Sequence, residues 1–165
     1  MFTIEGLGSF LEYSDWANEE LIKSASRLSD EQLDQPCDMG RGSLRLTLMH
    51  IWAGEHVWLK RWQGQTETPW PNEDVRLTPA QIGSRFREVA VERGVFLSDL
   101  TAANLNREIT YRDSKGSLFR AKLSDMVTQG LVHSIHHRAQ ASNMIRRAGG
   151  AIVELDYMYH LRTPA

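Results

Sequence analysis

The amino-acid sequence predicts an all-α protein, a four-helix bundle with a small β-hairpin between the third and fourth long helices. Two observations favour this class. Four segments of about 20 residues repeat apolar side chains at the spacing of an amphipathic helix. Two short runs on either side of "DSKG" have the composition of paired strands. We expect the 165 residues to form one domain, 1–165, because about 150 residues per domain is usual.

The first two long helices are predicted at residues 9–28 and 43–62. Between them, Ser29 and Gln32 in "SDEQLDQP" have the spacing of a capping box, which indicates a short helical piece. Ser43 follows "GRG" and is a suitable N-cap for the second helix. The run "TPWPNED" after this helix is rich in turn residues and predicts a loop.

The third long helix has the clearest start signal in the chain. Thr78 is placed as the N-cap, Pro79 at the first helical position and Gln81 at the third. The apolar spacing then continues to about Leu100. The connection to the fourth helix is long and carries the hairpin, so that it allows a topology other than simple up-and-down.

The fourth long helix is predicted at residues 124–148, where Gly149 and Gly150 form a good C-terminal stop. A last short helix is predicted within "VELDYMYHL". The chain contains no internal repeat, low-complexity tract or linker.

Composition and charge exclude several classes of function. The formal net charge of −2 gives no electrostatic reason to bind nucleic acid, and no cationic face is visible. No apolar run approaches the roughly 20 residues of a membrane span. A single cysteine, Cys37, indicates a reducing compartment and argues against a cysteine-rich zinc site. Because the N-terminal segment has no signal-peptide pattern, we expect a cytoplasmic protein.

The stretch "LVHSIHHRAQ" in the fourth helix contains three histidines. On a helical wheel, His137 falls inside the apolar arc and His133 at its edge, whereas His136 falls on the polar side. The i, i+4 spacing places His133 and His137 on one face, as in the HExxH helices that bind zinc. Met126 and Met144 lie near this face and are interpreted as core residues rather than ligands.

A metal site needs a third protein ligand, usually from another element. His50 borders the apolar arc of the second helix, beside Ile51, much as His133 borders its own arc. His56 falls on the other side with Arg45 and is expected to be exposed. His160 belongs to the terminal segment and has no spacing relation to the others.

The spacing therefore selects His50, His133 and His137 as candidate metal ligands. The competing interpretation is that they are satisfied core histidines, which a helical bundle also accommodates. Three imidazoles would leave at least one coordination position open, which is characteristic of catalytic sites. Imidazole suits zinc, nickel, iron and copper, so that the donor set does not fix the metal.

At these residues the sequence resembles the DinB/YfiT-like family of bacterial metal-binding four-helix bundles, over essentially the whole chain. The matching segments are "GSLRLTLMHIWAGEHVWLKRW", with His50 and Glu55, and "LVHSIHHRAQ", with His133, His137, Arg138 and Gln140. The hairpin region and the closing "LDYMYHLR" also resemble the family, and all these segments occur in the order that the family has.

The resemblance implies a divalent metal held by His50, His133 and His137, with zinc or nickel first and iron or manganese as further candidates. It also implies a homodimer. One departure is Ala139, where the family often has glycine. Alanine is also small, so that only the approach of the neighbouring helix is affected.

The resembled superfamily includes thiol-dependent transferases and isomerases that use bacterial low-molecular-weight thiols. We therefore expect a metal-dependent thiol S-transferase that binds the substrate thiolate in the open position. Two alternatives stay open, and no catalytic residue is assigned. One is a metal-dependent hydrolase that uses metal-bound hydroxide and a carboxylate base. The other is a non-catalytic metal-binding stress protein.

Several further residues receive a structural or an orienting role. Glu55 is expected to be a buried partner of Arg138 rather than a general base, because an unpaired buried charge is costly. Arg138 and Gln140 either orient the ligands or act as ordinary packing residues. Trp52 lies away from the His50 face, which favours a role between subunits. Three further tryptophans are expected in the core or in a dimer interface rather than in a substrate-binding cage: Trp16, Trp58 and Trp62.

Overall fold

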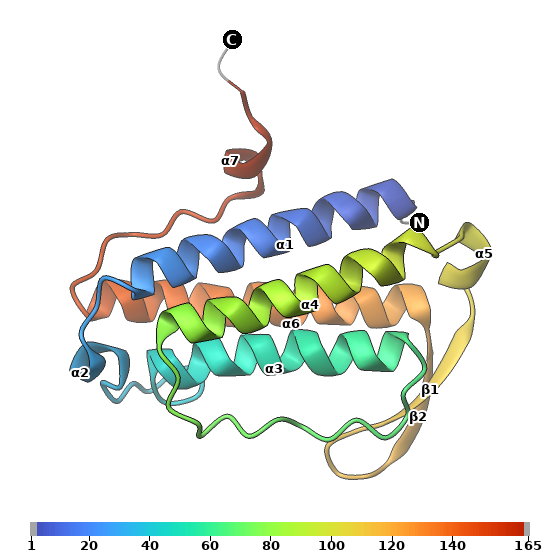
Figure 1. Ribbon diagram of the computed structural model, residues 1–165, viewed down its shortest axis with the longest axis horizontal. Coiled ribbons are helices and arrows are strands. Elements are labelled where there is room, and N and C mark those ends of the chain that lie inside the picture. The colour runs from blue at the N-terminus through green and yellow to red at the C-terminus, as the bar shows by residue number, and fades with distance from the viewer. Residues whose placement is uncertain (1–2, 164–165) are drawn as a thin grey trace.

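The predicted four-helix bundle is confirmed by the computed structural model, which describes residues 3–163. Residues 1–2 and 164–165, the ends of the predicted 1–165 domain, lie outside the described range. Four long helices lie side by side along the longest axis of the molecule (Figure 1). They are α1 (Ile4–Ala25), α3 (Leu44–Trp62), α4 (Pro79–Ser98) and α6 (Leu123–Arg147).

The shorter elements lie in the connections and at the C-terminal end. The predicted hairpin is present between α4 and α6, and its antiparallel strands pair with Ile109 opposite Ala121. These elements are α2 (Asp30–Leu33), α5 (Ala102–Leu105), α7 (Tyr157–Leu161), β1 (Glu108–Arg112) and β2 (Leu118–Lys122).

The bundle contains one crossover connection. Helices α1 and α6 run in one direction and α3 and α4 in the other, so that the chain must return along the bundle between α3 and α4 (Figure 1). Residues 63–78, here called the crossover strap, make this return. The 19 residues of α3 span about 28 Å, which a strap of this length covers easily. We expected any unusual connection at the hairpin, and the structure places it one connection earlier.

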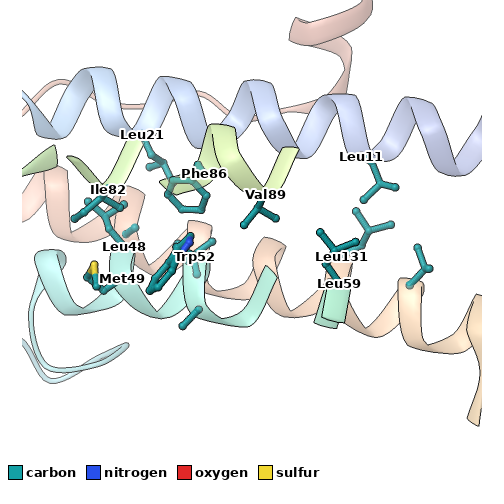
Figure 2. Packing of buried hydrophobic residues seen from close by; sticks show 14 of the residues in the cluster. Leu11, Leu21, Leu48, Met49, Trp52, Leu59, Ile82, Phe86, Val89 and Leu131 are labelled. Carbon is teal, nitrogen blue, oxygen red and sulfur yellow. The ribbon is translucent and has the colours of Figure 1, made fainter. Parts of the chain in front are cut away.

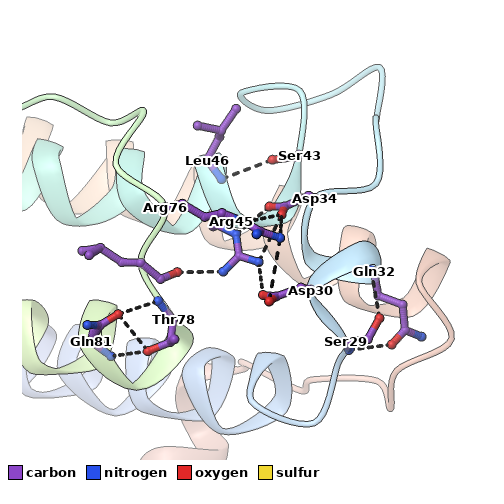
Figure 3. Close-up of polar contacts among 11 residues, drawn as sticks. Ser29, Asp30, Gln32, Asp34, Ser43, Arg45, Leu46, Arg76, Thr78 and Gln81 are labelled. Atoms are coloured by element: carbon purple, nitrogen blue, oxygen red, sulfur yellow. Dashed lines mark hydrogen bonds and ion pairs between the residues drawn. The ribbon is translucent and has the colours of Figure 1, made fainter.

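The predicted helix caps are confirmed (Figure 3). Ser29 with Gln32 and Thr78 with Gln81 each form a complete capping box, in which two backbone N–H groups gain side-chain acceptors. The Ser43 hydroxyl accepts a hydrogen bond from the Leu46 N–H at 3.3 Å. These caps set the starts of α2, α3 and α4.

Several predicted boundaries were wrong. Helix α1 begins at Ile4 instead of residue 9, because the Thr3 hydroxyl caps it by accepting from the Gly6 N–H at 3.1 Å. The glycines in this turn weaken a helix intrinsically, but burial of Leu7 and Leu11 outweighs that preference. Helix α5 was not predicted, and the predicted terminal helix is reduced to the five residues of α7.

His56 was expected to be exposed on the side of the helix that carries Arg45, but the structure leaves neither side chain exposed. Arg45 is buried because α2 covers it, and its guanidinium binds Asp30 and Asp34 at 2.5 Å each (Figure 3). His56 is half-buried, and its ring centroid lies 5.9 Å from that of Trp52.

Trp52 belongs to the core of this chain rather than to a subunit interface, which corrects the prediction. Helix α4 covers its side of α3, and Trp52 packs near Phe86 (Figure 2), with only 6% of its surface exposed. The Arg85 guanidinium lies 4.6 Å from its ring centroid. The core assignments of Trp62, Met126 and Met144 are confirmed, whereas Trp16 and Trp58 are half-buried.

Within residues 3–163, none of the helices combines the length and apolar character that a membrane crossing requires.

Candidate metal centre

The three histidines selected from the sequence come together between α3 and α6. His50 lies in the second turn of α3, and His133 and His137 lie one turn apart on α6. One ligand atom from each of the three lies within 4.8 Å of the others, and all three side chains are half-buried. The cluster could therefore hold a metal ion.

The ring nitrogens face one another at a spacing that suits a metal. The Nε2 atoms of His50 and His133 are 3.3 Å apart. Two nitrogens bound to a tetrahedral zinc ion at about 2.0–2.1 Å would themselves lie about 3.3 Å apart. When both imidazoles are neutral, a single proton can lie between these two atoms, whereas a divalent cation accepts both lone pairs. The donor set and its spacing therefore fit a divalent metal.

Glu73, in the crossover strap, contacts His50 on the side away from the other histidines. Its Oε1 lies 2.6 Å from His50 Nδ1 and accepts a hydrogen bond from Trp70 Nε1 at 2.5 Å. Its Oε2 accepts from Arg41 Nε at 3.3 Å. No helical spacing connects these loop residues to His50, so that Glu73, Trp70 and Arg41 were not predicted from the sequence.

The other two histidines differ in what holds them. His137 Nδ1 lies 2.7 Å from Gln140 Oε1. Of the two roles predicted for Gln140, this contact favours the orienting role over ordinary packing. His133 Nδ1 is buried and has no hydrogen-bond partner within residues 3–163. Acceptors at Nδ1 keep the ring proton there and leave Nε2 of His50 and His137 available as ligand atoms.

Gly54 allows α3 to approach the His133 ring. A Cβ atom at this position would lie 2.4 Å from Cε1 and 2.7 Å from Nδ1 of His133, closer than real contacts allow. The glycine is thus required by packing, in the middle of a helix where it costs about 1 kcal/mol relative to alanine.

The electrostatics of the site favour the neutral form of His133 and His137. Burial, followed by the neighbouring His137 and His50, lowers the pKa of His133 to about 4. Burial also lowers the pKa of His137. For Glu73, burial alone would raise the pKa, but hydrogen bonds from His50 and Trp70 outweigh it and hold the pKa below its usual range. A lowered pKa at His133 and His137 favours the neutral imidazole, which is the form that binds a metal.

The remaining histidines lie outside the cluster. His136 is exposed, as predicted, although its ring centroid is 4.9 Å from that of His137. His160 lies against α1, with its ring centroid 5.5 Å from that of Trp16.

Glu55 takes part in a second polar group at the centre of the bundle. As predicted, it is a buried partner of Arg138, whose Nη1 lies 3.6 Å from Glu55 Oε1. Arg93 Nη1 lies 3.4 Å from Glu55 Oε2, and Arg93 also pairs with Asp15. The group, here called the central ionic cluster, draws on all four long helices. Its members are Ser14, Asp15, Asn18, Glu55, Arg93, Ser134 and Arg138.

The fold and the cluster together define a class of protein: a four-helix bundle with three histidines that could hold a divalent metal between two helices. The chain belongs to the DinB family, whose profile matches residues 1–164. This confirms the resemblance inferred from the sequence.

Individual relatives support the assignment. The chain is 20% identical over 163 residues to Protein DinB of Bacillus subtilis strain 168, covering 91% of this chain and 90% of that protein. A crystal structure of a DinB-like protein from Bacillus cereus ATCC 10987 matches with a TM-score of 0.69 and 25% identity, over 91% of this chain and 95% of that one. A DinB-like protein from Bacillus subtilis matches with a TM-score of 0.63 and 17% identity, over 90% and 94%.

Proposed function

We propose that this protein binds a divalent metal through His50, His133 and His137 and uses it in a reaction of a low-molecular-weight thiol. The observation that carries the proposal is the 3.3 Å separation of two ring nitrogens that face each other, with the third histidine beside them. Membership of the DinB family supports it. Zinc or nickel is the first candidate, and iron or manganese the second.

The proposed activity is that of a thiol S-transferase. A divalent metal in this site would stabilise a thiolate at neutral pH and so supply the nucleophile. The protein's own residues prepare the site: Glu73 contacts the His50 ring, Gln140 contacts the His137 ring, and burial lowers the pKa of His133 and His137.

The positions of two carboxylates favour this activity over hydrolysis. A hydrolase would need a carboxylate able to take a proton from water. Glu55 is engaged by Arg93 and Asn18 inside the bundle, and Glu73 is engaged by His50 and two further donors. Neither is placed as a general base, so that hydrolysis is the second candidate and a non-catalytic metal-binding role the third.

We also infer that the protein forms a homodimer, as the family resemblance implies, and that it acts in the reducing cytoplasm, as its single cysteine indicates. The mass of the protein in solution, measured by light scattering, tests the dimer. A monomer at all concentrations would contradict it.

Cobalt substitution tests the proposed function directly, because bound thiolate gives cobalt(II) an intense sulfur-to-metal absorption band. We expect the cobalt-loaded protein to develop this band when cysteine is added, and to transfer the thiol to an electrophilic acceptor such as a chlorodinitrobenzene. The His137→Ala variant should do neither, whereas His136→Ala should do both. Absence of the band together with cleavage of aryl esters would favour the hydrolase instead. Metal binding without either activity would favour the non-catalytic role.

A further inference from the structure

We propose that Glu73 is a positioning residue of the metal centre, which acts through His50 to fix the ring orientation and the tautomer of that ligand. The inference rests on the proposed metal site for its consequence, but the Glu73–His50 contact itself can be tested without metal. Nothing in the helical spacing of the sequence indicates this residue.

The carboxylate of Glu73 is held on both of its oxygens. His50 and Trp70 approach Oε1 at 2.6 and 2.5 Å, and Arg41 approaches Oε2 at 3.3 Å. Only 8% of the residue is exposed. The Trp70 ring also packs against the His50 ring, with 5.2 Å between the centroids. A carboxylate restrained in this way presents one fixed acceptor to His50.

The crossover strap places Glu73 over α3 because it is anchored on both sides. Near its start, the Arg112 N–H donates to the Thr66 carbonyl at 3.3 Å, and Arg112 Nε donates to Glu67 at 2.6 Å. At its end, Arg45 Nη1 donates to the Leu77 carbonyl at 2.7 Å. The parallel course of α3 and α4 requires a strap here, and the strap brings a carboxylate to His50.

The acceptors of the three histidines form a graded series. His50 faces an ionised carboxylate, His137 faces the neutral amide oxygen of Gln140, and His133 Nδ1 faces no acceptor within residues 3–163. A charged acceptor strengthens electron donation by the opposite ring nitrogen more than a neutral amide does. His50 is therefore the strongest donor of the three, and loss of Glu73 should weaken metal binding more than loss of Gln140.

The first experiment measures zinc affinity by competition with a chromophoric chelator. Glu73→Leu should bind zinc about 10–100-fold more weakly than the wild type, the usual cost of removing an outer hydrogen-bond partner of a ligand. Glu73→Gln should lose less, because its amide oxygen still accepts from His50. Asp74→Asn is the matched control: it removes the same charge from the adjacent, exposed position and should leave the affinity unchanged.

A second readout is independent of the metal and separates positioning from general destabilisation. Nitrogen-15 NMR of the metal-free protein should show His50 protonated at Nδ1 in the wild type and in Asp74→Asn, and a mixture of tautomers in Glu73→Leu. Trp70→Phe keeps the ring but removes one donor to Glu73. It should weaken zinc binding in the wild-type background and have no further effect in the Glu73→Leu background.

The inference is overturned if Glu73→Leu, shown to be folded by circular dichroism, binds zinc like Asp74→Asn, or if the His50 tautomer is unchanged in Glu73→Leu. Failure of the proposed function looks different. The wild type itself would then bind no zinc, while the tautomer measurement would still show whether Glu73 controls His50.

Discussion

The two polar groups on α3 and α6 have opposite surroundings. Glu55 faces the centre of the bundle, where guanidinium groups from α4 and α6 approach its carboxylate. His50, little more than one turn away, lies between Glu73 of the crossover strap and α6, where two more imidazoles approach its ring. The first group joins opposite charges, whereas the second joins like groups.

This difference separates a structural role from a binding role. The carboxylates and guanidinium groups of the central ionic cluster compensate one another within the protein. In the histidine cluster, one ligand atom from each ring lies within 4.8 Å of the others, so that the group could hold a metal ion. The proposed divalent cation would complete this second group, whereas the first group is already paired. Four predictions test this contrast, in order of decreasing effect.

Removal of the Glu55 charge from the central ionic cluster should have the largest effect on stability. We expect Glu55→Gln to lower the free energy of unfolding by about 3–5 kcal/mol, because it leaves two buried guanidinium groups short of negative charge. His136→Ala, at an exposed position, should change it by less than about 0.5 kcal/mol. Chemical denaturation measures both. A small effect of Glu55→Gln would show that the cluster is not a structural element.

A divalent metal bound by the histidine cluster should stabilise the folded protein. At a free zinc concentration 100-fold above the dissociation constant, the free energy of unfolding should rise by about 2.7 kcal/mol. Calorimetry should then show a melting temperature higher by about 5–10 °C, reversed by a chelator. The shift should disappear in His133→Ala. Persistence of the shift in that variant would place zinc elsewhere.

Two glycine substitutions test how closely α3 packs against the His133 ring. Gly54→Ala should destabilise the protein by about 1–3 kcal/mol and weaken zinc binding, because the new methyl group displaces the His133 ring. Gly94→Ala is the matched change on α4, where a Cβ atom would meet nothing within 4 Å. It should stabilise the protein by up to about 1 kcal/mol. Equal effects of the two substitutions would contradict the close approach at Gly54.

The smallest effect concerns pH and an ion pair outside both groups. Hydrogen bonds from Arg45 lower the pKa of Asp34 below its ordinary value of 3.8. Its contribution to stability is therefore present above the ordinary value and is lost as the pH falls through the lower, folded value. Asp34→Asn should cost less than about 1 kcal/mol at neutral pH and make unfolding less sensitive to acid. An unchanged acid dependence in this variant would show that Asp34 contributes nothing.

Local patterns in the sequence predicted the parts of the molecule that depend on near neighbours. The caps at Ser29, Ser43 and Thr78 involve residues three positions apart, and the pairing of His133 with His137 follows from one helical turn. The prediction that His50 joins His133 and His137 required only that the apolar arcs of the two helices face each other. Each of these inferences uses helical geometry alone.

The parts that were missed depend on contacts between distant segments. Glu73 lies 23 positions from His50 and reaches it only because the strap crosses back along the bundle. Helical spacing places Arg45 on the polar side of its own helix, and α2 buries it. The prediction began the first helix at residue 9, whereas the Thr3 cap and the burial of Leu7 start it at Ile4. Tertiary packing decided all three.

The proposed function rests on metal binding by His50, His133 and His137. Elemental analysis of the purified protein, prepared without chelator, measures this binding, together with the His137→Ala and His136→Ala variants. We predict about one divalent metal ion per chain in the wild type and in His136→Ala, and almost none in His137→Ala. Absence of metal from the wild type, even after reconstitution with zinc, nickel or manganese, would contradict the claim. Equal metal loss in both variants would contradict the assignment of the ligands.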